Sequence, residues 1–302
     1  MQLQGAFLPV TTPFDPATGD VDVDSFRANL TRWFEHPLAG VLVGGSTGES
    51  VFLEEDETAA LLEAAEEVLP VEARIIVGTG AESTRTATRL AREAAAGGAD
   101  AVLVSPPAYY RTAMTPEVLV RHYTAVADAS PVPVIVYQVP LRMSTLDLPS
   151  GLLVELSHHD NIVGIKDSRG KLELVGELVE ACADDFQVLV GSGALLYGAL
   201  EVGASGGIVA VGLMATADAA EIYQAFTEGD TARAGRIQER IAPVHNQIVG
   251  GMGVPGIKKA LDLLGYRGGE PRPPLAPLAP GRDDEIRAIL AGAGLLEGAP
   301  AA

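Results

Sequence analysis

Short runs of hydrophobic, mostly β-branched residues alternate with longer polar and apolar segments of helical periodicity along most of the chain. Each run is nearly continuous in hydrophobicity, which is typical of parallel strands covered on both faces. Eight candidate strands are found in this way, at residues 6–10, 41–43, 74–77, 101–104, 134–137, 162–165, 187–190 and 207–210.

The segments between these runs carry the start signals of helices. Acidic residues fill the first turn of the segment 53–69, Ser83 precedes the next as an N-cap, and Pro116 stands at the first helical position of a third. Helices are also expected between the later strands and throughout the C-terminal region, at residues 148–157, 171–183, 194–202, 218–228, 231–249, 255–264 and 283–296.

Eight strands that alternate with helices favour a (β/α)8 TIM barrel over a doubly wound sheet, and so an α/β fold class. We expect the catalytic barrel to span residues 1–225 and a C-terminal helical extension to span residues 226–302. No independent second core is evident in the extension, whose final helix follows a proline-rich link at 271–280.

Charge and composition exclude several classes of protein. The 302 residues carry a formal net charge of −19, which argues against binding to nucleic-acid phosphates or to anionic membranes. Cys182 is the single cysteine, so neither an internal disulfide nor a cysteine-based metal site is expected. The N-terminal residues show no targeting pattern, and no apolar run is long enough to span a bilayer. We therefore expect a cytoplasmic protein.

Lysine is rare, and one lysine stands where the chemistry of a barrel is expected. The four lysines are Lys166, Lys171, Lys258 and Lys259. Lys166 closes the apolar strand 162–165, at the end where barrel active sites form. A buried ammonium is costly unless it is paired or deprotonated, and a neutral amine attacks carbonyl groups to form a Schiff base. The alternatives are an ion pair with Asp167 or a side chain that reaches solvent.

Two further strand ends carry polar groups that suit such chemistry. Tyr137 ends the preceding strand, where a phenol can relay protons to and from a carbinolamine; the alternative is a core aromatic. The glycine-rich segment 44–48 offers the hydroxyls of Ser46 and Thr47 and backbone N–H groups, which suit a carboxylate. It could equally be a tight turn between a strand and a helix.

Three motifs together resemble those of a known family. They are Gly-Ser-Thr-Gly-Glu at 45–49, Tyr-Gln-Val-Pro at 137–140 and Gly-Ile-Lys-Asp-Ser at 164–168. The chain resembles the dihydrodipicolinate synthase and N-acetylneuraminate lyase family of class I, Schiff-base aldolases, over essentially its whole length. Within that family the segments 107–111, 161–168 and 253–269 are most similar to 4-hydroxy-2-oxoglutarate aldolase.

The resemblance implies roles for individual residues. Lys166 would form the Schiff base, and Tyr137 would relay protons, with Thr47 as a link in the relay. Tyr109 would reach into a neighbouring subunit of a homotetramer, although Tyr110 competes for that match. The substrate-binding candidates are Ser46, Thr47, Arg142, Ser168 and, in the last predicted strand, Val209. No cofactor and no metal are expected.

Two departures from the synthase pattern affect the expected substrate. Gln138 stands where synthases usually have asparagine, and the segment 140–144 keeps only its Pro140 and the basic Arg142 of the synthase sequence Pro-Ser-Arg-Thr-Gly. The closer resemblance to 4-hydroxy-2-oxoglutarate aldolase implies retro-aldol cleavage of that compound, or of a similar 4-hydroxy-2-oxo acid, to pyruvate and an aldehyde. The alternatives are a 4-hydroxy-tetrahydrodipicolinate synthase, which condenses pyruvate with aspartate semialdehyde, and a barrel that binds 2-oxo acids without catalysis.

Other polar segments are assigned no catalytic role. The glycine-rich stretch 251–258 lacks the Lys-Ser/Thr of a phosphate loop, and the segment 158–160 is expected to be a solvated turn. His122 and His245 are expected to be surface or packing residues, and Lys258 and Lys259 exposed helical lysines. A metal-dependent class II aldolase would need a cluster of His or carboxylates at the strand ends, which the sequence does not show.

Overall fold

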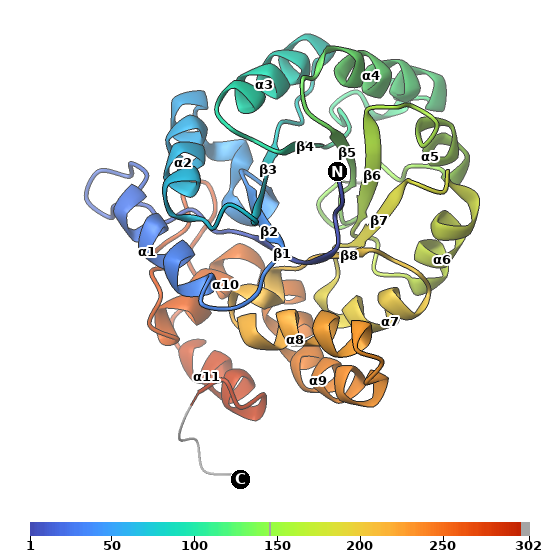
Figure 1. Ribbon diagram of the computed structural model, residues 1–302. Coiled ribbons are helices and arrows are strands. Elements are labelled where there is room, and N and C mark those ends of the chain that lie inside the picture. The colour runs from blue at the N-terminus through green and yellow to red at the C-terminus, as the bar shows by residue number, and fades with distance from the viewer. Residues whose placement is uncertain (145, 297–302) are drawn as a thin grey trace.

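The strands form a closed parallel barrel, as predicted (Figure 1). The computed structural model describes residues 1–144 and 146–296. Neighbouring strands pair in chain order, and the last strand pairs with the first to close the barrel. The strands are β1 (Gly5–Pro9), β2 (Gly40–Val43), β3 (Arg74–Gly78), β4 (Ala101–Val104), β5 (Val134–Gln138), β6 (Ile162–Asp167), β7 (Gln187–Val190) and β8 (Gly206–Ile208).

A ring of helices surrounds the barrel in Figure 1. They are α1 (Val23–Trp33), α2 (Glu55–Val68), α3 (Thr84–Ala96), α4 (Pro116–Ala129), α5 (Ser150–Leu156), α6 (Leu172–Ala181), α7 (Leu196–Glu201) and α8 (Thr216–Thr227). The sequence analysis missed α1. Its signals are the carboxylate of Asp22, which accepts a hydrogen bond from the Ser25 N–H, and buried Phe26, Leu30 and Trp33 at helical spacing.

The C-terminal extension consists of α9 (Thr231–Val244), a π-helix (His245–Gly250), α10 (Gly253–Leu263) and α11 (Asp283–Gly292). The single helix predicted over 231–249 is wrong, because the α-helix ends at Val244 and continues as a π-helix. Pro243 lies inside α9, where it lacks the N–H that an α-helical hydrogen bond requires. Within the described residues, no helix is long and apolar enough to cross a bilayer.

Side chains on the two faces of the strands build two separate cores. Phe7, Leu42 and Ile135 belong to the cluster that fills the barrel, whereas Leu8 and Val43 pack outward against the helices. The alternation follows from the two-residue period of a strand. Tyr137 belongs to the inner cluster and is paired in register with Lys166, so both side chains face the barrel interior.

The extension is joined to the barrel by a buried ion pair. Lys258 of α10 contacts the Glu49 carboxylate at 2.5 Å, and neither side chain is exposed. The ammonium also donates to the Glu270 carbonyl and lies over the Phe14 ring. The expectation that Lys258 is an exposed helical lysine is therefore wrong, since its helix face packs against the loop that follows β2.

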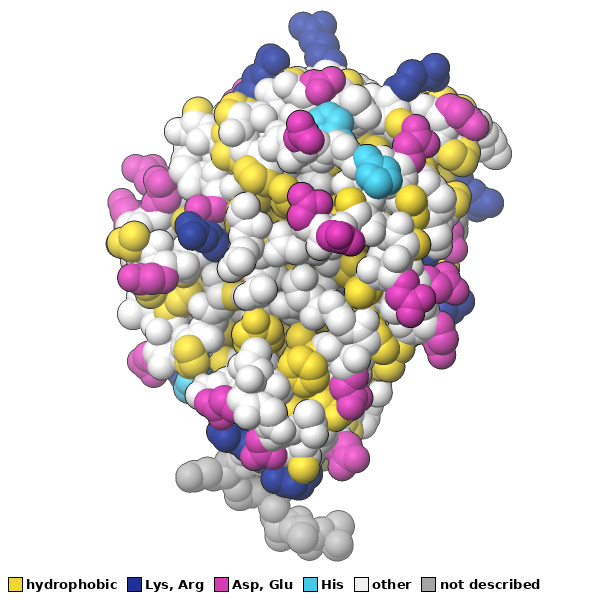
Figure 2. Space-filling model, turned by 45° about the vertical axis from the view of Figure 1, so that its right-hand side comes forward, with side chains coloured by type: hydrophobic (Ala, Val, Ile, Leu, Met, Phe, Trp, Pro, Cys, Tyr) yellow, Lys and Arg dark blue, Asp and Glu magenta, His cyan; other side chains and the backbone are white. Residues whose placement is uncertain are grey.

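The surface reflects the acidic composition. Figure 2 shows Asp and Glu side chains spread over the face that it displays, with Lys and Arg mostly at its edges. This face carries no broad basic area of the kind that nucleic-acid binding requires.

Candidate active site

Lys166 lies at the carboxyl end of β6, buried inside the barrel. Lys166 is 5% exposed, and burial lowers the pKa of its amine from 10.5 to about 7. The ion pair with Asp167 that the sequence left open is not formed. Asp167 instead accepts hydrogen bonds from the Arg169 guanidinium, at 2.9 Å from Nε, in a pair that is also buried. Near neutral pH a large fraction of Lys166 is therefore an uncharged nucleophile.

Tyr137 stands beside the amine on the neighbouring strand. The Nζ of Lys166 lies 4.7 Å from the centre of the Tyr137 ring, and the two residues are paired in register. Burial raises the pKa of the phenol, while hydrogen bonds with Ser46 and Ser168 act in the opposite direction. The group therefore remains a protonated phenol that can donate and accept near the amine.

The loop after β2 brings hydroxyl groups to the phenol. Ser46 Oγ lies 3.4 Å from Tyr137 Oη. This contact is made by Ser46, the neighbour of Thr47, for which a link in the relay was expected; both residues are half-buried in a short 3-10 turn. The Thr12 hydroxyl donates to the Gly48 carbonyl at 2.7 Å, which fixes the turn. The next residue, Glu49, adopts a left-handed conformation with φ of 60° and is held by its ion pair with Lys258.

Ser168 follows Lys166 by two residues and packs tightly against the next strand. Its N–H donates to the Gln138 carbonyl at 3.1 Å. A Cβ added to Gly191, just beyond β7, would lie 1.9 Å from the Ser168 Oγ. Glycine is therefore required at 191 for the Ser168 hydroxyl to occupy its place next to Tyr137.

Gln138 organises the loop that carries Arg142. Its buried amide donates to the Leu146 carbonyl at 3.2 Å and accepts from the Leu148 N–H at 2.7 Å. Arg142 itself is exposed, and its Nη2 donates to the Val249 carbonyl of the π-helix at 3.4 Å. Gln138, which departs from the synthase pattern, therefore sets the path of the loop. Its amide is engaged there and is not free to face the site.

Three further candidates lie on an exposed loop or in the outer core. Tyr109 and Tyr110 are 80% and 71% exposed, and their rings pack edge to face on each other. The Glu82 carboxylate accepts from the Tyr109 N–H at 2.9 Å and so holds this loop. Val209 is fully buried in the layer between strands and helices, so its side chain is not exposed at the barrel mouth.

The sequence analysis did not find the polar pair that the extension contributes to the mouth. His245, the first residue of the π-helix, is half-buried, and its Nε2 lies 3.2 Å from Ser192 Oγ, just beyond β7. The position of Ser192 just after the strand was a signal that this serine lies at the barrel mouth. Nothing in the sequence indicated that His245 faces Ser192, because their contact joins positions 53 residues apart.

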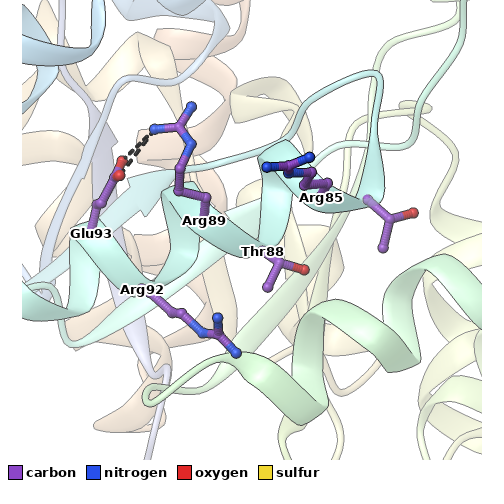
Figure 3. A pocket seen from close by; sticks show the side chains of 6 residues that line it. Arg85, Thr88, Arg89, Arg92 and Glu93 are labelled. Carbon is purple, nitrogen blue, oxygen red and sulfur yellow. Dashed lines mark hydrogen bonds and ion pairs between the residues drawn. The ribbon is translucent and has the colours of Figure 1, made fainter.

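The described part of the chain shows no grouping of residues for a metal centre. Within it, no group of three or more His, Cys, Asp or Glu side chains could hold a metal ion. A hollow of about 410 Å³ lies along α3, lined by Arg85, Arg89 and Arg92 (Figure 3). Arg89 is bound to Glu93 on the same helix, and the lining residues all belong to α3, so the hollow is a helix surface and not part of the barrel mouth.

The fold and this site define a class of enzyme. A closed (β/α)8 barrel that holds a buried lysine amine of lowered pKa, a phenol and hydroxyl groups at its strand ends is the arrangement of a class I aldolase. Residues 2–293 match the model of the dihydrodipicolinate synthetase family. The chain belongs to this family and is a class I carbon–carbon lyase.

The similar proteins cover the whole chain. A 4-hydroxy-tetrahydrodipicolinate synthase from Nitratidesulfovibrio vulgaris (strain Miyazaki F) is 34% identical over 296 residues, which are 98% of this chain and 100% of the relative. The synthase from Acinetobacter baumannii, solved in complex with pyruvate, has a TM-score of 0.92 at 30% identity and covers 98% of this chain and 100% of its own. A prophage protein of the same family from E. coli K12, also in complex with pyruvate, has a TM-score of 0.91 at 26% identity, with coverage of 98% and 100%.

These relatives change one expectation. The motifs resembled 4-hydroxy-2-oxoglutarate aldolase most, whereas the named relatives at about one-third identity are 4-hydroxy-tetrahydrodipicolinate synthases. The family assignment is confirmed, and within the family the named relatives favour the synthases over the aldolase.

Proposed function

We propose that this enzyme captures pyruvate as a Schiff base at Lys166 and joins it to an aldehyde that carries a carboxylate, in the manner of a 4-hydroxy-tetrahydrodipicolinate synthase acting on aspartate semialdehyde. The observation that carries the proposal is the state of Lys166, a buried amine whose neighbouring carboxylate is bound to Arg169. Synthases at 34% identity over the full chain support the choice of aldehyde.

The residues at the mouth suit each step of such a reaction. The Lys166 amine attacks the C2 carbonyl of pyruvate, and loss of water from the carbinolamine leaves an iminium. Removal of a proton from C3 gives an enamine, which forms the new bond to the aldehyde carbon while the aldehyde oxygen takes up a proton. Hydrolysis of the iminium then releases the product and restores the amine. Tyr137 moves the protons, with Ser46 in contact with its hydroxyl.

Binding of the two carboxylates is assigned to different loops. Ser46, Thr47 and the backbone N–H groups of their turn would hold the carboxylate of pyruvate. Arg142 would hold the carboxylate of the aldehyde, since a guanidinium can form two parallel hydrogen bonds with that group. The exposed Tyr109 and Tyr110 fit a contact with a second copy of the chain, and we extend the proposal to a homo-oligomer.

A second candidate is the retro-aldol cleavage of 4-hydroxy-2-oxoglutarate to pyruvate and glyoxylate. It is favoured by Ser168, whose hydroxyl is bonded to Tyr137 and whose position matches the aldolase pattern. Both candidates use the same Schiff base and differ in the partner.

Incubation with pyruvate and borohydride tests the shared step. One peptide, containing Lys166, should gain a reduced pyruvyl group, and modification at Lys171 alone or no modification would refute the proposal. Rates of condensation with aspartate semialdehyde and of cleavage of 4-hydroxy-2-oxoglutarate then separate the candidates. Arg142→Ala should reduce kcat/KM for either substrate while pyruvate capture persists, with the exposed α9 residue Arg236 replaced by alanine as the control.

A further inference from the structure

Ser192 and His245 form a hydrogen-bonded pair at the barrel mouth, with 3.2 Å between Ser192 Oγ and His245 Nε2. We propose that Ser192 is a second hydrogen-bond donor, beside Arg142, for the carboxylate of the aldehyde, and that His245 is the positioning residue that orients its hydroxyl. The inference rests on the proposed function, because it concerns the aldehyde half of that reaction.

The hydrogen-bond directions around the imidazole leave the serine hydrogen available. The Gly193 N–H donates to His245 Nδ1 at 3.2 Å, so Nδ1 is an acceptor and the neutral ring carries its hydrogen on Nε2. Nε2 then donates to Ser192 Oγ, which leaves the hydroxyl hydrogen of Ser192 free to donate to a ligand. Burial, together with the charge of Arg142, lowers the pKa of His245 to about 4, so this arrangement persists near neutral pH.

Ser192 is connected to the reacting amine through contacts along the strand ends. Leu189 of β7 is in register with Lys166, and Ser192 lies three residues further toward the mouth. Its neighbour Gly191 packs against Ser168, whose hydroxyl is bonded to Tyr137. The Ser192 hydroxyl therefore lies on the rim of the site that contains the proposed Schiff base.

One element holds both proposed donors. The π-helix places His245 against Ser192 and offers the Val249 carbonyl to the Arg142 guanidinium. Among the described residues, no carboxylate forms a salt bridge with Arg142, whose side chain contacts the Val249 carbonyl, so its charge is available to an anion. A guanidinium and a hydroxyl held by the same short helix are complementary to the oxygens of one carboxylate. π-Helical turns are frequent at functional sites, which agrees with this role.

Two substitutions at Ser192 test the donor. Ser192→Ala should lower kcat/KM about 10–100-fold for glyoxylate and aspartate semialdehyde, the range expected for one hydrogen bond to a charged group, and should leave acetaldehyde and the borohydride capture of pyruvate unchanged. Ser192→Thr keeps the hydroxyl and should stay close to the parent enzyme. If Ser192→Ala has unchanged kinetics with the carboxylated aldehydes, the role of Ser192 is overturned while the proposed function stands. Failure of the parent enzyme to capture pyruvate would overturn the proposed function and this inference together.

Two substitutions at His245 test the positioning. His245→Asn keeps an acceptor for the Gly193 N–H but lacks a donor that reaches Ser192, so it should reproduce the selectivity of Ser192→Ala. His245→Gln places an amide N–H near the Nε2 position and should retain most of the activity. The double variant Ser192→Ala/His245→Asn should be no worse than Ser192→Ala. Equal losses with acetaldehyde, carboxylated aldehydes and pyruvate capture would instead identify His245 as a structural residue and refute the positioning role.

Discussion

The Glu49 carboxylate and the Lys258 ammonium lie 2.5 Å apart with both side chains fully buried, although 209 residues separate them in the chain. The pair joins the loop that contains Ser46 and Thr47 to the C-terminal helices. Both oxygens of the Glu49 carboxylate accept hydrogen bonds, because the second one accepts from the Arg272 N–H at 2.8 Å.

Loss of one partner should be strongly destabilising. Lys258→Met leaves a buried carboxylate without its counter-ion and should lower the free energy of unfolding by about 3–5 kcal/mol. Lys259→Met is the matched control, because its exposed bridge to Asp283 should contribute about 0–1 kcal/mol. The double variant Glu49→Gln/Lys258→Met should recover part of the loss. Chemical denaturation measures all three, and equal stabilities of the two single variants would contradict the prediction.

The depressed pKa of Lys166 predicts a pH dependence of pyruvate capture. The uncharged fraction of the amine grows as pH rises, so the rate of borohydride-trapped modification should increase about tenfold per pH unit below 7 and level off above it. A profile that still rises steeply between pH 8 and 10 would show that the amine keeps an ordinary pKa.

The same shift predicts that Lys166 destabilises the fold. The pKa of the Lys166 amine is about 7 in the folded protein, against a reference value of 10.5 that applies to the unfolded chain. Between these pH values the unfolded chain binds more protons, so the free energy of unfolding rises with pH across that window. Lys166→Met should therefore raise Tm at pH 7, and the gain should shrink as pH approaches 10. Lys171→Met, at an exposed position, should show no such trend. A gain that is constant with pH would refute the assignment.

Removal of the Tyr137 hydroxyl separates proton transfer from packing. Tyr137→Phe keeps the ring next to Lys166, so Tm should change little while kcat falls about 10²–10⁴-fold. Ser46→Ala should have a smaller effect in the same direction, because its contact with the phenol is long, at 3.4 Å. An unchanged kcat in Tyr137→Phe would remove the phenol from the proton relay.

A methyl group at Gly191 should disturb the site through Ser168. The added Cβ would lie 1.9 Å from the Ser168 Oγ, which must move away from Tyr137, so Gly191→Ala should lower kcat with a modest loss of stability. Gly176→Ala is the control: its Cβ would meet only Val202 at 3.8 Å, and alanine favours the helix by about 0.5–1 kcal/mol. Full activity of Gly191→Ala would show that the Ser168 position is unimportant.

The barrel was predictable because each strand is covered on both faces and is therefore apolar throughout. The positions of Lys166 and Tyr137 at the ends of neighbouring strands followed from the same pattern, whereas the roles expected of them came from the motifs that resemble the family. The burial of Lys258 and the 3.2 Å contact between Ser192 and His245 were not predictable. Each depends on how the C-terminal helices pack against loops far away in sequence, and a local pattern carries no record of that packing.

The position of the π-helix and of Lys258 in the last part of the chain has a consequence for synthesis on the ribosome. When β8 has been made, every strand of the barrel exists, yet the partner of Glu49, the imidazole that faces Ser192 and the carbonyl that contacts Arg142 have still to be translated. A nascent barrel can thus form before its mouth is finished. Completion of the mouth therefore follows the translation of β8, and a chain released between β8 and α10 would lack the residues that close the site.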